Sequence, residues 1–401
     1  MFNFKRIKLA TMSALYTLAF PFTTMVMFFV NIFRPVKIAF LTSTRIGHLA
    51  LDTDLFLRRK KLGLIDSKQL TVFVSETNRS NLTLLTMWRR IIPILDNYFL
   101  RHFLEPLNKF HSRYVQDLKM KSNEYYEFNN ASSSLVFTDE EIQFGDSVLS
   151  KMGIKSDDWF VCVFARDSAY LKDIMPSNNF TYHDYRDADI NTYIEAVKYI
   201  IKKGGWVIRV GKTVEKKIDF NHPRLIDYSF SEYQNDFMDI YLLKRCKFMI
   251  SNTSGIGDVA KIFDTPFCGV NIMPIDHSPW TKNSIFIPKK IKNKKTGKWL
   301  SFNEYFNILD SKDLSGVDSS CYFFSKFYKD EGLEIVDNSS SEILDVTKEM
   351  FEFLEKRHVS KPLEQERQHK FQSIHERSYQ FSPVKTPIGK RFLVNNSWLI
   401  N

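Results

Sequence analysis

The chain has 401 residues, a formal net charge of +10, 44% hydrophobic and 25% charged residues. This length exceeds one ordinary domain and predicts two folded domains with additional segments. The basic balance favours anionic partners, namely acidic lipids, phosphorylated substrates or nucleic acid. The sequence has no arginine-rich arm, zinc-finger spacing or RNA-binding signature, so we predict no nucleic-acid partner. Four widely spaced cysteines without metal spacing favour reduced thiols in a cytosolic setting.

Residues 9–33 form a long stretch without a charged side chain, which basic residues precede and Arg34 and Lys37 follow. About 20 apolar residues span a bilayer as a helix, so we predict a membrane anchor at residues 1–35. Pro21 and several threonines leave an interfacial helix open, and a buried helix of a soluble protein is the other alternative. A cleaved signal peptide is disfavoured because no small-residue cleavage site follows the stretch.

The remaining chain predicts an N-terminal α/β domain at residues 36–135, a second α/β domain at 155–357 and a C-terminal tail at 358–401. The tail is polar, and it either packs back onto the second domain or stays partly disordered. For the first domain we expect strands at 36–42 and 70–74, and helices up to about residue 61 and across 80–118. A polar linker at 119–134 follows, and then a helix at 138–152 that precedes the second domain.

The second domain shows the clearer alternation of strands and helices. We expect strands at 159–165, 206–211, 224–228, 247–251 and 266–272, and helices at 190–203, 235–245, 256–263 and 340–356. Short loops and β-branched strands in this order predict a parallel sheet with helices on both faces. The sequence therefore predicts two Rossmann-like domains behind an N-terminal hydrophobic helix, with a cleft at the carboxyl ends of both sheets.

A small-residue turn follows the predicted strand at 247–251. Thr253, Ser254 and Gly255 stand where a helix begins, so main-chain N–H groups and hydroxyls would face an anion there. Asp258, in the first turn of that helix, either bonds a ligand hydroxyl or caps the helix. An ordinary strand–helix turn without a ligand is the alternative interpretation.

This segment resembles the nucleotide-sugar half of GT-B enzymes such as heptosyltransferases and sugar 2-epimerases. Those enzymes have an Asp/Ser-Gly turn, a helix, then a Gly/Thr-Pro step and a strand. Here Ser254 and Gly255 form the turn, and Thr265 and Pro266 follow the helix. The Asp that commonly precedes Ser-Gly in those enzymes is absent.

A second motif follows the first predicted strand, where Gly47 permits a tight turn and His48 opens a helix. Asp52 and Asp54 lie about one turn further along. His48 at this position is a candidate general base, and either carboxylate could orient the imidazole or serve as the base instead. A capping or packed histidine is the alternative.

A third group consists of cations at strand or helix ends: Arg166 after 159–165, Arg186 before the helix at 190, and Arg209 and Lys212 around the end of 206–211. Several cations at one sheet edge would neutralise a diphosphate. Any one of them taken alone is more often a surface or salt-bridge residue.

Together these motifs resemble a family of bacterial surface-polysaccharide glycosyltransferases, and the resemblance covers about residues 36–310. The matching segments are Arg45–Leu49, Arg166–Tyr170, Tyr185–Ile190, Gly204–Gly211 and Ser251–Gly255. The resemblance implies a GT-B fold and transfer of a sugar from a nucleotide-sugar donor to a growing surface polysaccharide or lipid-linked acceptor. An in-line attack from the first domain would invert the anomeric carbon.

No metal or other cofactor is expected, because cations already neutralise the leaving group. The triplets at 52–54 and 187–189 fit the acidic start of a helix better than a metal site. A lysine-rich run at 289–298 is either a solvated loop or a contact with anionic lipid.

Two other functions remain open: a GT-B-like sugar-nucleotide epimerase, and a non-catalytic membrane-bound module of a polysaccharide assembly complex. The hydrophobic N-terminus disfavours the epimerase, which needs no anchor. Because nucleotide sugars are cytosolic in bacteria, we expect the catalytic domains on the cytoplasmic side of a bacterial inner membrane.

Overall fold

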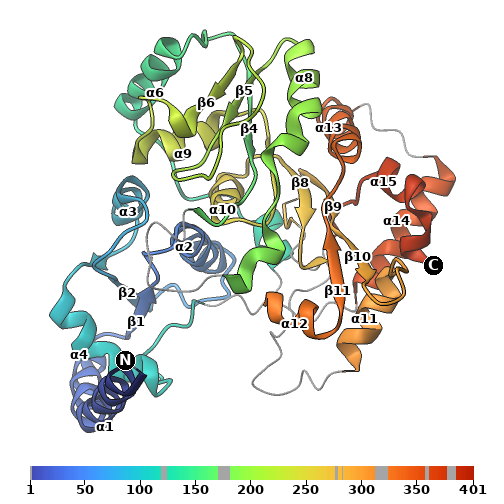
Figure 1. Ribbon diagram of the computed structural model, residues 1–401. Helices are drawn as coiled ribbons and strands as arrows, with labels where there is room; N and C mark the ends of the chain where they lie inside the picture. Colours follow the sequence, from blue (N-terminus) through green and yellow to red (C-terminus); the bar gives the residue numbers. More distant parts are fainter. Residues whose placement is uncertain are drawn as a thin grey trace. The chain divides into compact units, whose positions relative to one another are not determined.

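The computed structural model describes residues 2–118, 124–169, 181–275, 279–281, 283–311, 324–356, 361–376 and 385–401. These residues belong to two compact units. Unit 1 comprises residues 1–120 and 130–136, and unit 2 comprises residues 121–129 and 137–401. Figure 1 shows the chain with its helices and strands labelled.

Unit 1 contains a parallel three-stranded sheet in the order β1-β2-β3, in which each strand is followed by a helix. Its strands are β1 (Val36–Leu41), β2 (Leu70–Ser75) and β3 (Ile94–Leu95); its helices are α1 (Phe2–Phe33), α2 (Ile46–Lys61), α3 (Leu82–Arg89) and α4 (Tyr98–Lys109). Trp88 of α3 is fully buried, and its indole N–H donates to the main-chain oxygen of Leu49 at 3.0 Å. This bond fixes α3 against α2.

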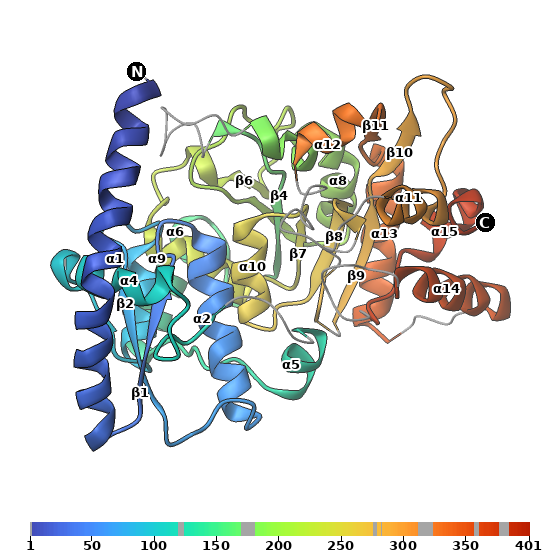
Figure 2. The ribbon, with the colours of Figure 1, turned by 90° about the horizontal axis from the view of Figure 1, so that it is seen from below.

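Helix α1 packs along unit 1 beside α4, as Figure 2 shows for the long N-terminal helix. Within the described residues, Met12–Phe33 is the one segment long and apolar enough to cross a membrane by length and composition. Thr23 and Met27 are nevertheless buried in unit 1, at 0% and 4% exposure. One side of the helix therefore belongs to the protein core.

Unit 2 contains a parallel six-stranded sheet in the order β6-β5-β4-β7-β8-β9. Its strands are β4 (Phe160–Phe164), β5 (Trp206–Arg209), β6 (Leu225–Asp227), β7 (Met249–Ser251), β8 (Phe267–Ile272) and β9 (Ser284–Pro288). Counted along the chain this order is 3-2-1-4-5-6, which is the order of the Rossmann fold. The predicted fold class, two Rossmann-like α/β units with an N-terminal hydrophobic helix, is thereby confirmed.

The helices of unit 2 follow the sequence pattern closely between residues 138 and 272. They are α5 (Glu124–Asn130), α6 (Asp139–Lys151), α8 (Ile194–Lys202), α9 (Asp236–Arg245), α10 (Gly255–Ile262), α11 (Phe302–Asp310), α12 (Ser325–Asp330), α13 (Ser340–Leu354), α14 (Pro362–His375) and α15 (Lys390–Asn395), with short 3₁₀ turns η1 (Thr181–Arg186) and η2 (Ile190–Tyr193). Two glycines separate α8 from β5. Gly204 has a φ of +89°, and a Cβ at Gly205 would lie 2.2 Å from the Trp159 ring.

Three parts of unit 2 refine or change the sequence-based expectation. Of the two alternatives for the C-terminal tail, the described residues show packing back onto unit 2, because Phe371 of α14 and Phe392 of α15 are buried in the main hydrophobic cluster. The linker stretch contributes α5, where Phe128 lies against Trp280 with 5.8 Å between ring centroids. In both cases a few aromatic residues in a polar sequence supply the buried contacts.

The lysine-rich run is the third such part. We expected a solvated loop or a contact with anionic lipid, but residues 289–293 are buried or half-buried. Lys289 is 3% exposed, and Lys290 pairs with Glu342 at 2.7 Å. The run forms β10 (Lys290–Asn293), which pairs in antiparallel fashion with β11 (Leu333–Val336). Only the turn around residues 294–298 is exposed.

Candidate functional site

The strand order of unit 2 reverses between β4 and β7. In open parallel sheets, ligands bind outside the carboxyl ends of the strands at such a switch point. The loop after β4 carries Arg166, and the loop after β7 carries Asn252, Thr253 and Ser254. Two of the predicted site segments therefore meet at the position that the topology favours for a ligand.

Asn252 fastens the two loops together. Its side chain is fully buried, and its Oδ1 accepts a hydrogen bond from the main-chain N–H of Arg166 at 3.0 Å. Its Nδ2 donates to the main-chain oxygen of Arg186 at 2.7 Å. Asn252 was not among the predicted site residues, although its place directly after a buried strand was a signal for it.

Helix α10 begins at this switch point. Ser254 is its N-cap residue, and the Ser254 hydroxyl accepts from the N–H of Gly257 at 3.3 Å and lies 3.1 Å from the Ser251 hydroxyl. Within the described part of the chain, no group accepts a hydrogen bond from the N–H of Gly255 or Ile256. Two main-chain donors at a positive helix end are thus available to an anion.

Thr253 and Asp258 lie on either side of the Ser254 cap. The Thr253 hydroxyl accepts from the N–H of Met273 at 3.3 Å, which ties the turn to the end of β8. Asp258 pairs with Lys261 at 2.9 Å along the same helix. Both side chains support the turn, and Asp258 has a cationic partner already.

Arg166 belongs to a buried charge network. Its side chain forms an ion pair with Asp187, and burial followed by the positive charge of Arg186 lowers the pKa of the Arg166 guanidinium to about 10. Lys289, at the end of β9, donates to the main-chain oxygen of Asp187 at 2.5 Å and pairs with Asp337 at 2.7 Å. Burial lowers the pKa of Lys289 as well. The carboxylates of this network hold its cations in place.

Two more of the predicted cations also have carboxylate partners. Arg209 is 1% exposed and pairs with Asp227 at 3.1 Å, and burial lowers the pKa of its guanidinium. Lys212 is half-exposed and pairs with Asp236 at 3.0 Å. Arg209 is thus enclosed as a core side chain, whereas Lys212 stays near the surface.

Arg186 differs from these three cations. Its guanidinium lies over the ring of Tyr185, 5.6 Å from the centroid, and its main-chain oxygen is held by Asn252. Its Nε is buried without a hydrogen-bond partner, and no carboxylate of the described residues forms an ion pair with it. A buried donor without an acceptor is unusual in folded proteins, because it costs about 1–3 kcal/mol. Arg209 Nε is also buried without a partner, but the Arg209 guanidinium pairs with Asp227. Arg186 is therefore the cation best prepared to receive an anion, because no carboxylate of the described residues pairs with it.

A cavity of about 330 Å³ opens beside this network at the end of β4. Its polar lining is mostly acidic and comprises Asp167, Asp187, Asp189, Glu215, Lys216 and Asp337. The cation of this set, Lys216, pairs with Asp189 at 2.8 Å. Carboxylates accept hydrogen bonds and repel phosphates, so this cavity suits a hydroxyl-rich group.

In unit 1, His48 and Asp52 lie together on α2. The two residues are four apart, which places them on one helix face. His48 Nδ1 lies 3.2 Å from Asp52 Oδ2, and the two side chains are 46% and 13% exposed. The structure thus brings together the predicted base and one of its two predicted carboxylates.

Asp54 lies away from this pair. Its side chain is fully buried, and its Oδ2 accepts from Arg58 Nε at 2.5 Å. Arg58, also fully buried, donates to the main-chain oxygen of Ala131. Asp54 and Arg58 thus form a buried ion pair that joins α2 to the segment at residues 130–136.

The turn that precedes His48 is held firmly. The N–H of Thr44 donates to Glu76 Oε2 at 3.0 Å, and the N–H of Glu76 donates to the Ser43 hydroxyl at 3.1 Å. Arg101 of α4 lies 3.8 Å from Glu76 Oε1. Glu76 and Arg101 were not predicted, but an acidic residue directly after a buried strand was a usable signal.

Each aspartate of the two Asp-x-Asp triplets has a basic partner. Asp52 pairs with His48, Asp54 with Arg58, Asp187 with Arg166 and Asp189 with Lys216. Among the described residues, no group of three or more His, Cys, Asp or Glu side chains has a geometry that could hold a metal ion. Tyr170 of the 166–170 motif lies outside the described residues.

No protein-family model and no curated protein sequence matches the chain. Among solved structures, it is similar to a glycosyl transferase family 9 protein of Veillonella parvula, with 9% identity, a TM-score of 0.38, and 63% of this chain and 86% of that chain covered. ADP-heptose lipopolysaccharide heptosyltransferase II of E. coli shows 10% identity, a TM-score of 0.40, and coverage of 63% and 90%. The dodecameric iron-containing heptosyltransferase TibC shows 12% identity, a TM-score of 0.39, and coverage of 81% and 79%.

Proposed function

We propose that this chain is a glycosyltransferase that moves a sugar from a nucleotide-sugar donor to a surface polysaccharide or lipid-linked acceptor. The observation that carries the proposal is the switch point of the unit 2 sheet. There, the open N–H groups of Gly255 and Ile256 and the Nε of Arg186 are available around Asn252, which holds both loops. A diphosphate is a ligand that satisfies donors of this kind.

The charges of unit 2 suggest that two parts of the donor molecule, its diphosphate and its hydroxyl-rich part, bind at two different places. The diphosphate would bind at the Ser254–Gly255 turn and at Arg186, where hydrogen-bond donors lack acceptors. Its hydroxyl-rich part would bind in the acidic cavity that Asp167 and Asp337 line. Arg166 and Lys289 keep that cavity from accumulating excess negative charge, because each is paired with one of its carboxylates.

His48 of unit 1 is the proposed general base. A sugar hydroxyl is a poor nucleophile, and removing its proton during attack typically contributes 10²–10⁴-fold to the rate. Asp52, at 3.2 Å, would hold the imidazole and stabilise its protonated form. Direct attack on the anomeric carbon, without a covalent enzyme intermediate, would invert its configuration.

The leaving diphosphate would be stabilised by Arg186 and the start of α10, so the proposed reaction uses no metal ion. The apolar helix α1 supports a location at a membrane, and we propose the cytoplasmic side of a bacterial inner membrane. There the protein would meet both a soluble donor and a membrane-bound acceptor.

The first experiment is a thermal-shift and calorimetry screen of the full-length protein against nucleoside diphosphates and nucleotide sugars. We expect at least one nucleotide to bind, and we expect Arg186→Gln to weaken this binding while Lys212→Gln leaves it nearly unchanged. The two substitutions remove the same charge at the edge of the same sheet. Equal losses in both variants, or no binding of any nucleotide, would refute the proposed donor site.

The reaction is tested by incubating the bound nucleotide sugar with membrane extracts and following the labelled sugar. Transfer to a polymer or lipid supports the proposal. Conversion of the donor into an isomeric sugar nucleotide would instead indicate an epimerase, and binding without turnover would indicate a non-catalytic module.

A further inference from the structure

Helix α1 is attached to unit 1 along most of its length. Ser13 contacts Lys109 of α4 at 2.5 Å, and Phe20 contacts Phe110 with 4.8 Å between ring centroids. At the other end, Asn31 accepts from the N–H of Val36 at 3.0 Å. The helix from Ser13 to Asn31, about 27 Å long, is therefore attached to the rest of unit 1 at both ends and near its middle.

The opposite side of α1 is exposed and apolar. Six exposed apolar residues of α1 recur at intervals of three and four, which is the spacing of one helix face. They are Leu15, Leu18, Phe22, Met25, Phe29 and Phe33, and their exposed fractions range from 49% to 89%. Phe28, Val30 and Ile32, near the end of the helix, are exposed as well.

Helix α4 extends this apolar face. Phe99 and Phe103 are 80% and 36% exposed, and the ring of Phe103 lies 5.9 Å from that of Phe22. The exposed stripe of α1 and the aromatic residues of α4 therefore form one surface, which we name the α1–α4 face.

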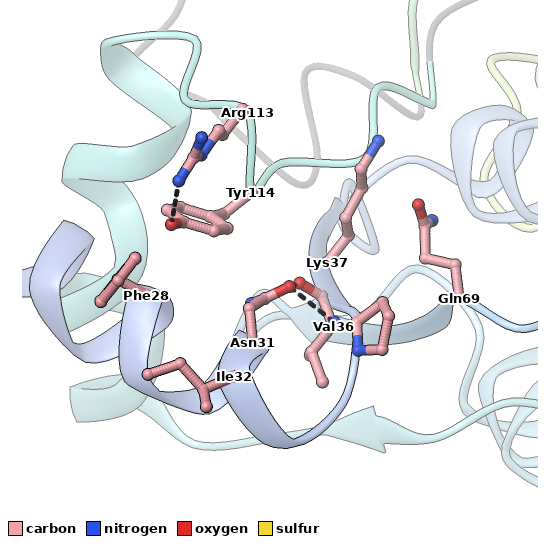
Figure 3. A pocket seen from close by; sticks show the side chains of 9 residues that line it. Phe28, Asn31, Ile32, Val36, Lys37, Gln69, Arg113 and Tyr114 are labelled. Carbon is pink, nitrogen blue, oxygen red and sulfur yellow. Dashed lines mark hydrogen bonds between the residues drawn. The ribbon is translucent and has the colours of Figure 1, made fainter.

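A cavity of about 390 Å³ borders the α1–α4 face where α1 leads into β1 (Figure 3). Phe28 and Ile32 supply its apolar side, and Lys37 and Arg113 supply its cationic side. No carboxylate in the described part of the chain is paired with either cation. The cavity thus combines an apolar side with unneutralised positive charge.

We propose that the α1–α4 face lies in the plane of a bilayer that contains anionic phospholipid, and that the cavity beside it binds a lipid phosphate. A helix that crossed the bilayer would carry α4 with it, because the two are packed together. Arg101, Glu105 and Lys109 of α4 would then enter the hydrocarbon, where ionised side chains are costly. Lying in the interface instead lets α1 present one side to lipid and the other to protein.

The charges around the cavity match such a surface. Arg34 is exposed next to it, and Lys37 begins β1 beside it. Each basic residue near an anionic bilayer strengthens its attraction. The cavity lies at the amino end of β1, whereas His48 follows the carboxyl end, about 20 Å away along a six-residue strand. The lipid site is therefore separate from the proposed acceptor chemistry.

A flotation experiment with full-length protein tests both parts of this proposal and needs no enzymatic activity. Vesicles of phosphatidylcholine alone are compared with vesicles that also contain phosphatidylglycerol. We expect Lys37→Gln with Arg113→Gln to lower binding to the anionic vesicles roughly 30-fold. Lys294→Gln with Lys295→Gln removes the same charge from an exposed turn of unit 2 and should change binding little.

The apolar half is tested with Phe99→Ser and Phe103→Ser, which should weaken binding to both vesicle types about tenfold or more. Ile142→Ser with Phe144→Ser, on the exposed side of α6, is the matched control. Circular dichroism and the melting temperature verify that each variant is folded. If the variant with Phe99→Ser and Phe103→Ser binds vesicles as well as the wild type does, α1 inserts without α4, and the proposal that the α1–α4 face binds the bilayer is refuted.

Depth measurements distinguish a helix in the plane from one that crosses. Leu18→Trp and Phe29→Trp are compared in vesicles with brominated lipids of known depth. An interfacial helix places both indoles at the same shallow depth. A crossing helix separates them by about 16 Å along the bilayer normal, which would overturn the proposal. If Lys37→Gln with Arg113→Gln binds anionic vesicles as well as the control Lys294→Gln with Lys295→Gln does, the proposed phosphate site is refuted.

Discussion

The carboxyl edges of the two sheets differ in how they hold their charged groups. In unit 1, the imidazole of His48 is 46% exposed and is held by one carboxylate, Asp52. In unit 2, Arg166 is 8% exposed, Asn252 is fully buried, and both belong to networks of several partners. The same strand–helix plan therefore supports one accessible site and one enclosed site.

This difference corresponds to two kinds of chemistry. A group that takes a proton from an incoming hydroxyl must reach solvent, so that the proton can leave afterwards. A group that stabilises a diphosphate acts more strongly when it is preorganised and shielded from water. The two settings therefore suit the roles proposed for them, which are proton transfer at unit 1 and charge stabilisation at unit 2.

The largest expected effect tests whether Asp54 belongs to the accessible site or to the core. Asp54→Asn removes the charge that Asp54 supplies to the buried guanidinium of Arg58, and breaking a buried ion pair costs about 3–5 kcal/mol. We expect a lower melting temperature and faster amide exchange across α2. Asp52→Asn, on the exposed side of the same helix, is the control and should leave both nearly unchanged. Loss of turnover without loss of stability in Asp54→Asn would instead make Asp54 the catalytic base.

The second prediction concerns the buried histidine of the C-terminal layer. Burial lowers the pKa of His375 to about 4, below the ordinary value of 6.5. Between these values the unfolded chain binds a proton that the folded chain does not, so stability falls as the pH decreases through this window. The whole shift corresponds to about 3 kcal/mol. Acid should therefore weaken the amide protection of α14.

His375→Phe keeps a ring of similar size and removes the titrating group. In this variant the protection of the α14 amides against hydrogen exchange should no longer change with pH between 6.5 and 4. An unchanged pH dependence would mean that carboxylates elsewhere in unit 2 control its acid stability.

The third prediction tests the accessible site itself. His48→Ala should lower transfer at least about 100-fold, because the nucleophile loses its base. Nucleotide affinity, measured by calorimetry, should persist because the proposed donor site lies in unit 2. Asp52→Asn should have a smaller effect, since it removes only the group that orients the imidazole. Near-full turnover in His48→Ala would show that the base is another residue.

The smallest expected effect separates the cations of the enclosed site. Arg186→Ala should weaken nucleotide binding by roughly tenfold or more, the value of one charge-assisted hydrogen bond. Lys212→Ala should change it much less, because Lys212 is half-exposed and paired with Asp236. A loss at Lys212 that equals the loss at Arg186 would move the phosphate site toward the end of β5.

Local patterns in the sequence were sufficient for the alternating part of unit 2. The runs at 159–165 and 266–272 became β4 and β8 because apolar β-branched residues between turns have few other stable arrangements. The strand β9 was not predicted, since the short run Ser284–Pro288 ends in a proline and follows a sequence with two further prolines, Pro274 and Pro279. Its pairing with β8 supplies what its own sequence does not indicate.

The sequence by itself determined the α/β class, the apolar N-terminal helix, and the positions of His48 and Ser254 at strand–helix turns. These follow from short-range periodicity and turn chemistry. Only the tertiary structure decided which charges have partners: Asp52 faces His48 while Asp54 faces Arg58, and Arg209 pairs with Asp227 while no carboxylate of the described residues pairs with Arg186. The physical reason is that the partner of a charge is often far away in sequence, as Lys289 is from Asp187, so chain packing rather than local pattern determines it.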